Sequence, residues 1–281
     1  MPHTHRLVLS SLPKESALIE VSRLTKTYGD VEAVRGVSFD VEAGEVFGFL
    51  GPNGAGKSTT ISMLCTLVTP TTGIARVSGF DVVTQRDDVR RHIGLVFQDP
   101  TLDVYLTGEQ NLRMHAELYD LDPKVIPARM RQMLDMVDLW DRRKQPVRTY
   151  SGGMRRRLEI ARGLMHSPRV LFLDEPTIGL DPQTRSSIWT YIRALRESEG
   201  TTIFMTTHYM EEAEYCDRIA IMDRGEIVVL DTPAALKASV GKTASLDDVF
   251  MHYTGSEIRD GFATGMNVNR EIMRAMTKGG R

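Results

Sequence analysis

The chain has 281 residues, of which 41% are hydrophobic and 26% charged, as in a globular protein with one large domain or two lobes. Its formal net charge of -2 provides no overall attraction to nucleic acid. No apolar run approaches the ~18 residues of a membrane-spanning helix, and no signal-peptide pattern opens the chain, so we expect a cytoplasmic protein. Cys65 and Cys216 lie in separate apolar-patterned segments, which predicts two buried free thiols.

The first predicted elements are strands. After a leader over residues 1–17, Ile19–Leu24 and Val37–Val41 alternate apolar and polar residues, as half-buried antiparallel strands do. The apolar run Val46–Leu50 predicts a buried strand, and Thr60–Leu67 can continue as a helix. A glycine-rich segment joins these last two elements.

The glycine-rich segment fits the phosphate-loop pattern G-x-x-x-x-G-K-[ST] in full, in the strand–loop–helix context that the pattern requires. Its glycines let backbone N–H groups point inward, and the helix N-terminus adds a positive end for phosphate. We expect Lys57 to reach the β- and γ-phosphates and Ser58 to ligate Mg²⁺. A chance glycine-rich turn is the alternative, and the flanking elements argue against it. The pattern therefore predicts nucleotide binding by Gly51, Pro52, Asn53, Gly54, Ala55, Gly56, Lys57, Ser58 and Thr59.

The middle of the chain is helical and then returns to strands. Leu106–Trp140 has a helical pattern with a break at Asp122–Pro123. Val170–Asp174 is a continuous apolar run that ends in a carboxylate, typical of a central parallel strand, and Thr202–Met205 is a second such run. A β-hairpin is expected between Ile219 and Leu230.

Two acidic residues end the first of these buried strands. A carboxylate at this end of a parallel strand lies where α/β sheets bind ligands, so Asp174 can hold Mg²⁺. Glu175, one residue further, could take a proton from water that attacks the γ-phosphate. The alternative is a helix cap before Pro176; the phosphate loop upstream favours the catalytic interpretation.

A second predicted anion site follows Tyr150. Ser151, Gly152 and Gly153 open a helix expected from about Met154 to Met165, whose first N–H groups are free. One nucleotide does not need two such sites in one chain, unless the second serves a nucleotide held by another copy. The alternative is a serine helix cap with flexible glycines.

The order and spacing of these motifs resemble the nucleotide-binding subunit of ATP-binding-cassette (ABC) transporters. The resemblance covers roughly residues 18–250, and the Ser-Gly-Gly element is its most specific part, because other phosphate-loop ATPases lack it. It is carried by Tyr28, the phosphate loop, Gln98, Ser151-Gly152-Gly153, Asp174-Glu175, Asp181 and His208.

The resemblance implies a role for each further residue. Tyr28 would stack on adenine, although a strand-end core tyrosine is the alternative. Gln98 would ligate Mg²⁺ and sense the membrane partner. Asp181 would couple two sites across a dimer, and Ser151-Gly152-Gly153 would contact the γ-phosphate held by the opposite subunit. His208 would contact the γ-phosphate and orient the water; a structural hydrogen bonder is the alternative.

Several residues resemble one branch of the family, the daunorubicin-resistance type of exporter ATPase. Met154 stands where many members have glutamine, and Leu246–Phe250 with Tyr253–Gly255 also fits the branch. The run Arg155–Arg157 fits too, and a solvated helix face is its plain structural interpretation. Tyr150 replaces the usual leucine, and we expect its ring to fill the same apolar position.

The resemblance implies an α/β fold: a phosphate-loop (RecA-like) mixed sheet core with an antiparallel β subdomain and an inserted α-helical subdomain at about residues 99–167. The nucleotide-binding domain would span residues 18–250, followed by a tail at 251–281. In that tail Val268, Ile272 and Met276 recur at helical spacing, which fits either a short amphipathic helix or a poorly ordered segment.

The implied function is ATP hydrolysis, with Mg²⁺, by a head-to-tail homodimer that drives export by a separate membrane permease. The permease would dock near Gln98–Leu112 at the cytoplasmic face of the membrane. A hydrophobic drug or antibiotic is the first expectation for the cargo, and no nucleic acid partner is expected. The alternatives are a soluble ABC-type ATPase that acts on DNA or ribosomes, and the energy subunit of an importer.

Overall fold

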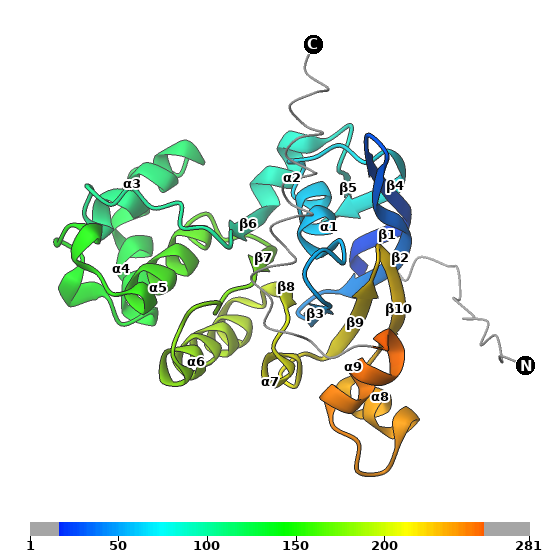
Figure 1. Ribbon diagram of the computed structural model, residues 1–281. Coiled ribbons are helices and arrows are strands. Elements are labelled where there is room, and N and C mark those ends of the chain that lie inside the picture. Colours follow the sequence, from blue (N-terminus) through cyan, green and yellow to red (C-terminus); the bar gives the residue numbers. More distant parts are fainter. Residues whose placement is uncertain (1–16, 256–281) are drawn as a thin grey trace, which may run out of the picture.

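A six-stranded mixed sheet forms the centre of the protein (Figure 1). The computed structural model describes residues 17–255. The strands of the sheet are β3 (Val46–Leu50), β6 (Ile93–Val96), β7 (Val170–Asp174), β8 (Thr202–Thr207), β9 (Arg218–Asp223) and β10 (Glu226–Asp231). Their order is β10-β9-β3-β8-β7-β6, and all neighbours are parallel except the β9–β10 hairpin. The predicted buried strands and the hairpin are confirmed.

A second, four-stranded sheet carries the antiparallel pair expected near the N-terminus. It comprises β1 (Ala17–Tyr28), β2 (Val31–Glu42), β4 (Thr72–Val77) and β5 (Phe80–Asp81), in the order β2-β1-β4-β5. β1 pairs antiparallel with both β2 and β4, with Val21 opposite Phe39 on one side and Ala75 on the other. The mixed core with an antiparallel subdomain is therefore as the family resemblance implied.

Each strand of the central sheet sends alternate side chains into two separate hydrophobic cores. In β8, Phe204 lies in the core shared with the antiparallel sheet, while Ile203 and Met205 lie in the opposite core. The first core contains a cluster of tilted and stacked phenylalanine rings, among them Phe39 and Phe47, whose centroids are 5.5 Å apart. Both faces of the sheet are thus closed to water, as its nearly continuous apolar strands predict.

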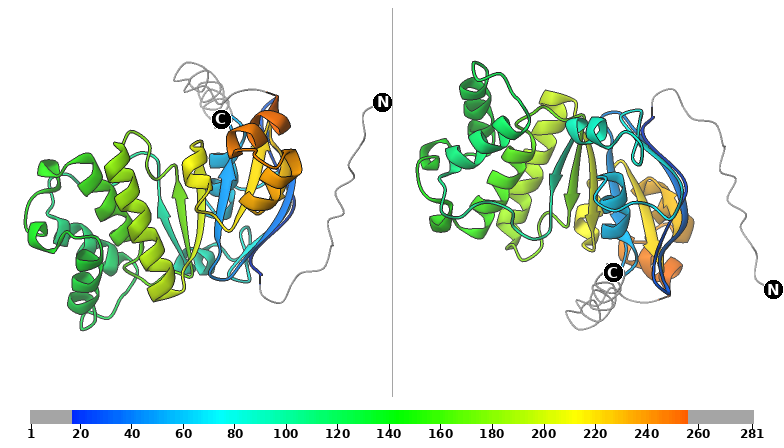
Figure 2. Two further views of the ribbon diagram at one scale, coloured as in Figure 1. Left: turned by 90° about the horizontal axis from the view of Figure 1, so that it is seen from below. Right: turned by 90° about the horizontal axis from the view of Figure 1, so that it is seen from above.

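Helices cover the sheet on both sides (Figure 2). They are α1 (Lys57–Leu64), α2 (Arg86–His92), α3 (Gly108–Leu118), α4 (Ile126–Met136), α5 (Gly152–Gly163), α6 (Pro182–Glu199), α7 (Met210–Ala213), α8 (Pro233–Val240) and α9 (Leu246–Thr254), with 3-10 turns at Trp140–Arg142 and Val147–Thr149. α1 packs in the core shared with the antiparallel sheet, and α5 and α6 pack in the opposite one. None of the helices within residues 17–255 is long and apolar enough to cross a membrane.

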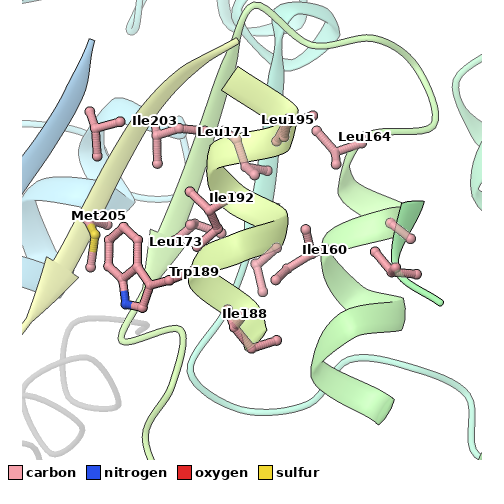
Figure 3. Close-up of a cluster of buried hydrophobic side chains, with 14 of the residues drawn as sticks. Ile160, Leu164, Leu171, Leu173, Ile188, Trp189, Ile192, Leu195, Ile203 and Met205 are labelled. Carbon is pink, nitrogen blue, oxygen red and sulfur yellow. The ribbon is translucent and has the colours of Figure 1, made fainter. Parts of the chain in front are cut away.

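The helical layer consists of α3, α4 and α5, which pack on one another and lie within residues 99–167. Two of these helices begin at a side-chain cap: Thr107 caps α3 in a capping box with Gln110, and Ser151 caps α5. α6 begins at the cap Asp181 and ends at Gly200, whose φ of 64° suits a glycine. Figure 3 shows α6 between α5 and the strands β7 and β8, packed through Ile160, Ile192 and Leu173.

Several predicted boundaries differ from the structure, those of α1, α5 and α9 among them. α1 begins at Lys57 and not at Thr60, and α5 covers Gly152–Gly163 and not the expected 154–165. α5 starts earlier because its cap is Ser151, so that both glycines are already helical. α9 runs to Thr254, across the boundary expected at residue 250. The leader before residue 17 and the pattern of Val268, Ile272 and Met276 lie outside the described residues.

Candidate active site

The phosphate loop joins the carboxyl end of β3 to the N-terminus of α1 and can form only with glycine at two of its positions. Gly56 has a φ of 106°, and a Cβ there would lie 2.5 Å from the carbonyl oxygen of Ala33. A Cβ on Gly51 would lie 2.3 Å from the carbonyl oxygen of Met222. A larger residue would push the loop away from β2 at Gly56 and away from β9 at Gly51, so the cradle depends on close backbone approach.

Lys57, the first residue of α1, is folded into this loop. Its side chain is 5% exposed, and its Nζ donates to the carbonyl oxygens of Gly51 (2.6 Å) and Pro52 (3.1 Å). Its Nζ also lies 3.8 Å from Oε1 of Glu175, which is itself buried. The ammonium is thereby held at the mouth of the loop, where a phosphate would meet it.

Asp174, at the carboxyl end of β7, meets Ser58 of the phosphate loop. Ser58 Oγ donates to Oδ1 of Asp174 at 3.2 Å, and Thr206 Oγ1 on neighbouring β8 donates to the same oxygen at 2.5 Å. The structure therefore brings together two of the three residues predicted to ligate Mg²⁺. Sequence reasoning did not identify Thr206, although a threonine near the end of an apolar strand, two residues before His208, was a usable signal.

Glu175 and His208 face each other at the ends of β7 and β8. Nδ1 of His208 lies 3.3 Å from Oε1 of Glu175. Glu175 has a φ of 47°, in the left-handed region that non-glycine residues seldom adopt, and its N–H donates to Thr206 Oγ1 at 3.0 Å. A strained backbone held by such contacts is characteristic of functional sites.

The electrostatics of this cluster shift the pKa values of its two carboxyl groups in opposite directions. Burial raises the pKa of Asp174, against the opposing hydrogen bonds from Thr206 and Ser58. Burial alone would also raise the pKa of Glu175, but the interaction with His208 and the charge of Lys57 outweigh it and lower that pKa. Burial lowers the pKa of Lys57, partly offset by both acids. Glu175 is therefore a carboxylate at neutral pH, as a general base must be.

Gln98 and Tyr28 lie on segments next to those that carry the cluster. Gln98 is exposed, two residues after the end of β6, the strand that pairs with β7. Tyr28 ends β1 and is half-buried; burial raises the pKa of its hydroxyl, against a hydrogen bond with Thr59 of α1. Lys26 Nζ lies 4.8 Å from its ring centroid. Tyr28 thus stands beside the phosphate loop, and is not a fully buried core residue.

Ser151-Gly152-Gly153 and Asp181 are not part of this cluster. Ser151 is exposed and caps α5, on the opposite side of the sheet from α1 (Figure 1). Asp181 is exposed and caps α6, where it accepts from the backbone N–H and the hydroxyl of Thr184. A Cβ on Gly153 would lie 2.5 Å from Cγ2 of Thr184, so these two helix starts pack against each other.

Of two predictions about residues near the start of α5, the one for Tyr150 agrees with the structure and the one for Arg156 does not. Tyr150 fills a buried position and donates its hydroxyl to the carbonyl oxygen of Arg142 at 2.8 Å, as an aromatic replacement for leucine should. A solvated face is wrong for Arg156, whose guanidinium is buried against the segments that carry Gln98 and Glu175. Sequence alone offered no signal to separate Arg156 from its neighbours in the run.

A family model described as "ABC transporter" matches residues 34–178, which include the phosphate loop, Ser151 and Glu175. This chain belongs to the ABC transporter family. It is an ABC ATPase, an enzyme that binds and hydrolyses ATP in support of transport.

Relatives and solved structures agree with this assignment. The ABC ATPase is 47% identical to the daunorubicin/doxorubicin resistance ATP-binding protein DrrA of Streptomyces peucetius, over 79% of this chain and 68% of that protein. It is 39% identical to the linearmycin resistance ATP-binding protein LnrL of Bacillus subtilis, over 87% of this chain and 77% of that one.

Among solved structures, cbiO1 of Clostridium perfringens, part of the transporter complex cbiONQ, superimposes with a TM-score of 0.75 at 29% identity, over 80% of this chain and 92% of that one. The dimeric cassette MJ0796 bound to ADP and Pi superimposes with a TM-score of 0.69 at 28% identity, over 76% of this chain and 98% of that one. The ABC ATPase fold is therefore shown by sequence and by structure.

Proposed function

We propose that this chain is the ATP-hydrolysing subunit of an efflux transporter whose membrane permease is a separate polypeptide. The observation that carries the proposal is the convergence of Lys57, Ser58, Asp174, Glu175 and His208 at the carboxyl ends of β3, β7 and β8. Open α/β sheets bind their ligands at this edge. The cluster combines a cation for phosphate, oxygen ligands and a base, which are the parts that phosphoryl transfer to water requires.

The oxygen ligands suit magnesium. Ser58 and Asp174 present a hydroxyl and a carboxylate within 3.2 Å of each other, and Gln98 would add an amide oxygen from the segment after β6, the strand next to β7. Hard oxygen ligands with a single carboxylate are the donor set that Mg²⁺ uses when substrate phosphates complete its shell. Bound there, Mg²⁺ would neutralise charge on the β- and γ-phosphate oxygens.

The residues of the cluster divide the chemistry. Lys57 would exchange its bonds to Gly51 and Pro52 for bonds to the phosphates. The phosphates would then be stabilised by the full positive charge of the ammonium at a buried site. Glu175, whose pKa is lowered by His208 and Lys57 despite its burial, would accept the proton of the attacking water. His208 would orient that water and contact the γ-phosphate. Tyr28, beside Thr59, would stack on adenine.

A second copy would complete the site. Ser151 and the two glycines present free N–H groups at the start of α5, away from the phosphate loop of the same chain. In a head-to-tail dimer these groups would reach the γ-phosphate of the opposite nucleotide, and the exposed Asp181 would link the two sites. ATP would then favour the closed dimer because it contacts both halves, and hydrolysis would reopen it.

The permease would dock on the segment Gln98–Leu112, and this docking would hold the subunit at the cytoplasmic face of the membrane. Tyr105 in this segment is 81% exposed, as a large side chain at a docking surface can be.

Relatives named for resistance to daunorubicin, doxorubicin and linearmycin support a hydrophobic antibiotic as the cargo.

The first test is to tag the chain, purify it from native membranes in mild detergent and identify what accompanies it. A stoichiometric polytopic membrane protein is expected. Co-purification with ribosomes or DNA-binding proteins, without a membrane protein, would favour a soluble ABC-type ATPase instead. A matched purification of Tyr105→Asp, a change at the exposed docking segment, should lose the membrane protein while it keeps ATP binding.

A further inference from the structure

Arg156, on the second turn of α5, has a guanidinium whose donors are all used. Its side chain is 8% exposed. Nε donates to the carbonyl oxygen of Pro176 (2.5 Å) and Nη2 to those of Asp174 and Glu175 (both 3.2 Å). Nη1 donates to the carbonyl oxygen of Phe97 (2.5 Å) and to Glu159 (3.2 Å). An arginine has five N–H groups, and each has an acceptor here.

Glu159, one turn further along α5, binds the backbone on the C-terminal side of Gln98, at Thr101. Its Oε1 accepts from the N–H of Thr101 at 2.8 Å, while Oε2 accepts from Arg156. Its side chain is 3% exposed. The pair therefore binds the backbone on both sides of Gln98, at Phe97 and at Thr101. Arg162 on the next turn also donates to the carbonyl oxygen of Thr101 at 2.9 Å.

We propose that the Arg156–Glu159 pair positions the catalytic machinery: it fixes the backbone of Glu175 and of the Gln98 segment relative to α5. The two residues are positioning residues, since neither faces the phosphate loop. Because α5 begins at Ser151, the same helix that would touch the partner's nucleotide would also set the local geometry of the base. The inference rests on the proposed function of Glu175 and Gln98.

The chemistry of the contacts favours positioning over stability. Four of the five bonds of Arg156 go to carbonyl oxygens of segments outside α5, three of them in succession at Asp174, Glu175 and Pro176. A buried ion pair is often replaceable by apolar residues without loss of stability, so such a pair needs another reason to be present. The left-handed φ of Glu175, 47°, is a conformation that external contacts must hold.

The test compares the double variant Arg156→Met/Glu159→Leu with the wild-type chain at full length. Both charges are removed together, so no unpaired charge stays buried. We expect a similar urea midpoint and a KM for ATP within about threefold, with kcat reduced roughly tenfold or more, since small misplacements of catalytic groups cost this much. Hydrogen exchange of the Glu175 amide should become faster, because its segment is released although its acceptor, Thr206, is untouched.

Two further variants sharpen the result. Arg156→Lys keeps the charge and can still pair with Glu159, but three donors cannot serve five acceptors, so kcat should not recover. Arg157→Met is the matched control: Arg157 lies in the same run but binds the carbonyl oxygen of Val137 and the hydroxyl of Tyr191, so kcat should stay within about twofold of wild type. Arg156→Lys carries the test if the double variant does not fold.

Wild-type kcat in the double variant, full recovery in Arg156→Lys, or unchanged exchange of the Glu175 amide overturns the proposal. Glu175→Gln in the same assay separates this failure from that of the proposed function. If Glu175→Gln hydrolyses ATP at the wild-type rate, the assigned base is wrong, while the exchange measurement still decides whether the pair positions residues 174–176.

Discussion

Among individual residues, Glu175 combines burial, an opposing charge and an unfavourable backbone conformation. Its left-handed φ of 47° costs about 1–2 kcal/mol in a residue with a Cβ. The N–H bond to Thr206 and the carbonyl bond from Arg156 hold the residue on both sides. The side chain is thereby directed at Lys57 and His208, 3.8 and 3.3 Å away.

Glu175→Gln should keep ATP binding and nearly abolish hydrolysis. The amide fills the same space and can still contact His208, but it cannot accept a proton from water at neutral pH. We expect kcat to fall by about 10²-fold or more, the usual scale for loss of a general base. The measurement is phosphate release at saturating ATP, with nucleotide affinity measured separately.

Glu211→Gln provides the control for that variant. Glu211 is also a glutamate near the end of β8, but its side chain is 85% exposed and lies 3.9 Å from Arg185. Its turnover should equal that of the wild type. Turnover in Glu175→Gln close to that of Glu211→Gln would rule out Glu175 as the base.

Among the elements, α3 and the segment after α5 meet through three aromatic side chains. The rings of Tyr119 and His166 stack with centroids 3.8 Å apart, and His115 lies 4.7 Å from Tyr119. Within residues 17–255, Nε2 of His115 and Nδ1 of His166 are buried without hydrogen-bond partners. Burial lowers the pKa of His115 to about 3 and that of His166 to about 4; the nearby charges of Arg162 and Arg129 act in the same direction.

Acid should therefore weaken this contact between elements. Both histidines titrate near 6.5 when unfolded and only near 3 and 4 when folded, so the unfolded state binds more protons between these values. The free energy of unfolding is therefore undiminished by these histidines above pH 6.5. It falls as the pH drops toward 4, by about 1.4 kcal/mol per pH unit for each histidine.

The measurement is urea unfolding at pH 7 and pH 5 for the wild type and His115→Phe. A phenyl ring keeps the aromatic packing but has no proton to bind. The loss of unfolding free energy between the two pH values should be about 2 kcal/mol smaller in the variant. An equal loss in both proteins would show that His115 does not titrate as described.

The sequence predicted elements better than the contacts between them. The apolar runs that became β3, β7 and β8 were identifiable, since periodicity and the flanking loops are local signals. The bond from Ser58 to Asp174 joins residues 116 positions apart and depends on β8 lying between β3 and β7. Arg156 could not be told from Arg155 and Arg157, because burial on one face of α5 is decided by the segments that pack there.

For the whole molecule, the position of α5 opposite α1 separates the two proposed anion sites of one chain. If two chains share each nucleotide, defects in the two sites should complement each other. Lys57→Ala removes the phosphate-loop cation, and Ser151→Arg blocks the start of α5, so each variant alone should be inactive. A mixed dimer retains one intact site, formed by the phosphate loop of the Ser151→Arg chain and the α5 of the Lys57→Ala chain.

An equimolar mixture should regain about a quarter of wild-type ATPase activity, since half of the dimers are mixed and each has one of two sites intact. The double variant Lys57→Ala/Ser151→Arg, mixed with wild type, provides the reference for subunit exchange, because its mixed dimers have no intact site. Activity in the Ser151→Arg protein alone, or no recovery in the mixture, would contradict the shared site.

The two hydrophobic cores on either side of the central sheet each contain one thiol. Cys65 lies in the core beneath α1, and Cys216 in the core beneath α6 and α7. Both are buried, and burial raises the pKa of each thiol, so neither reacts readily while its core is closed. The two native cysteines can therefore report on the two cores separately. Pulsed alkylation, followed by mass spectrometry at Cys65 and at Cys216, would measure the rate at which each core opens, without any engineered label.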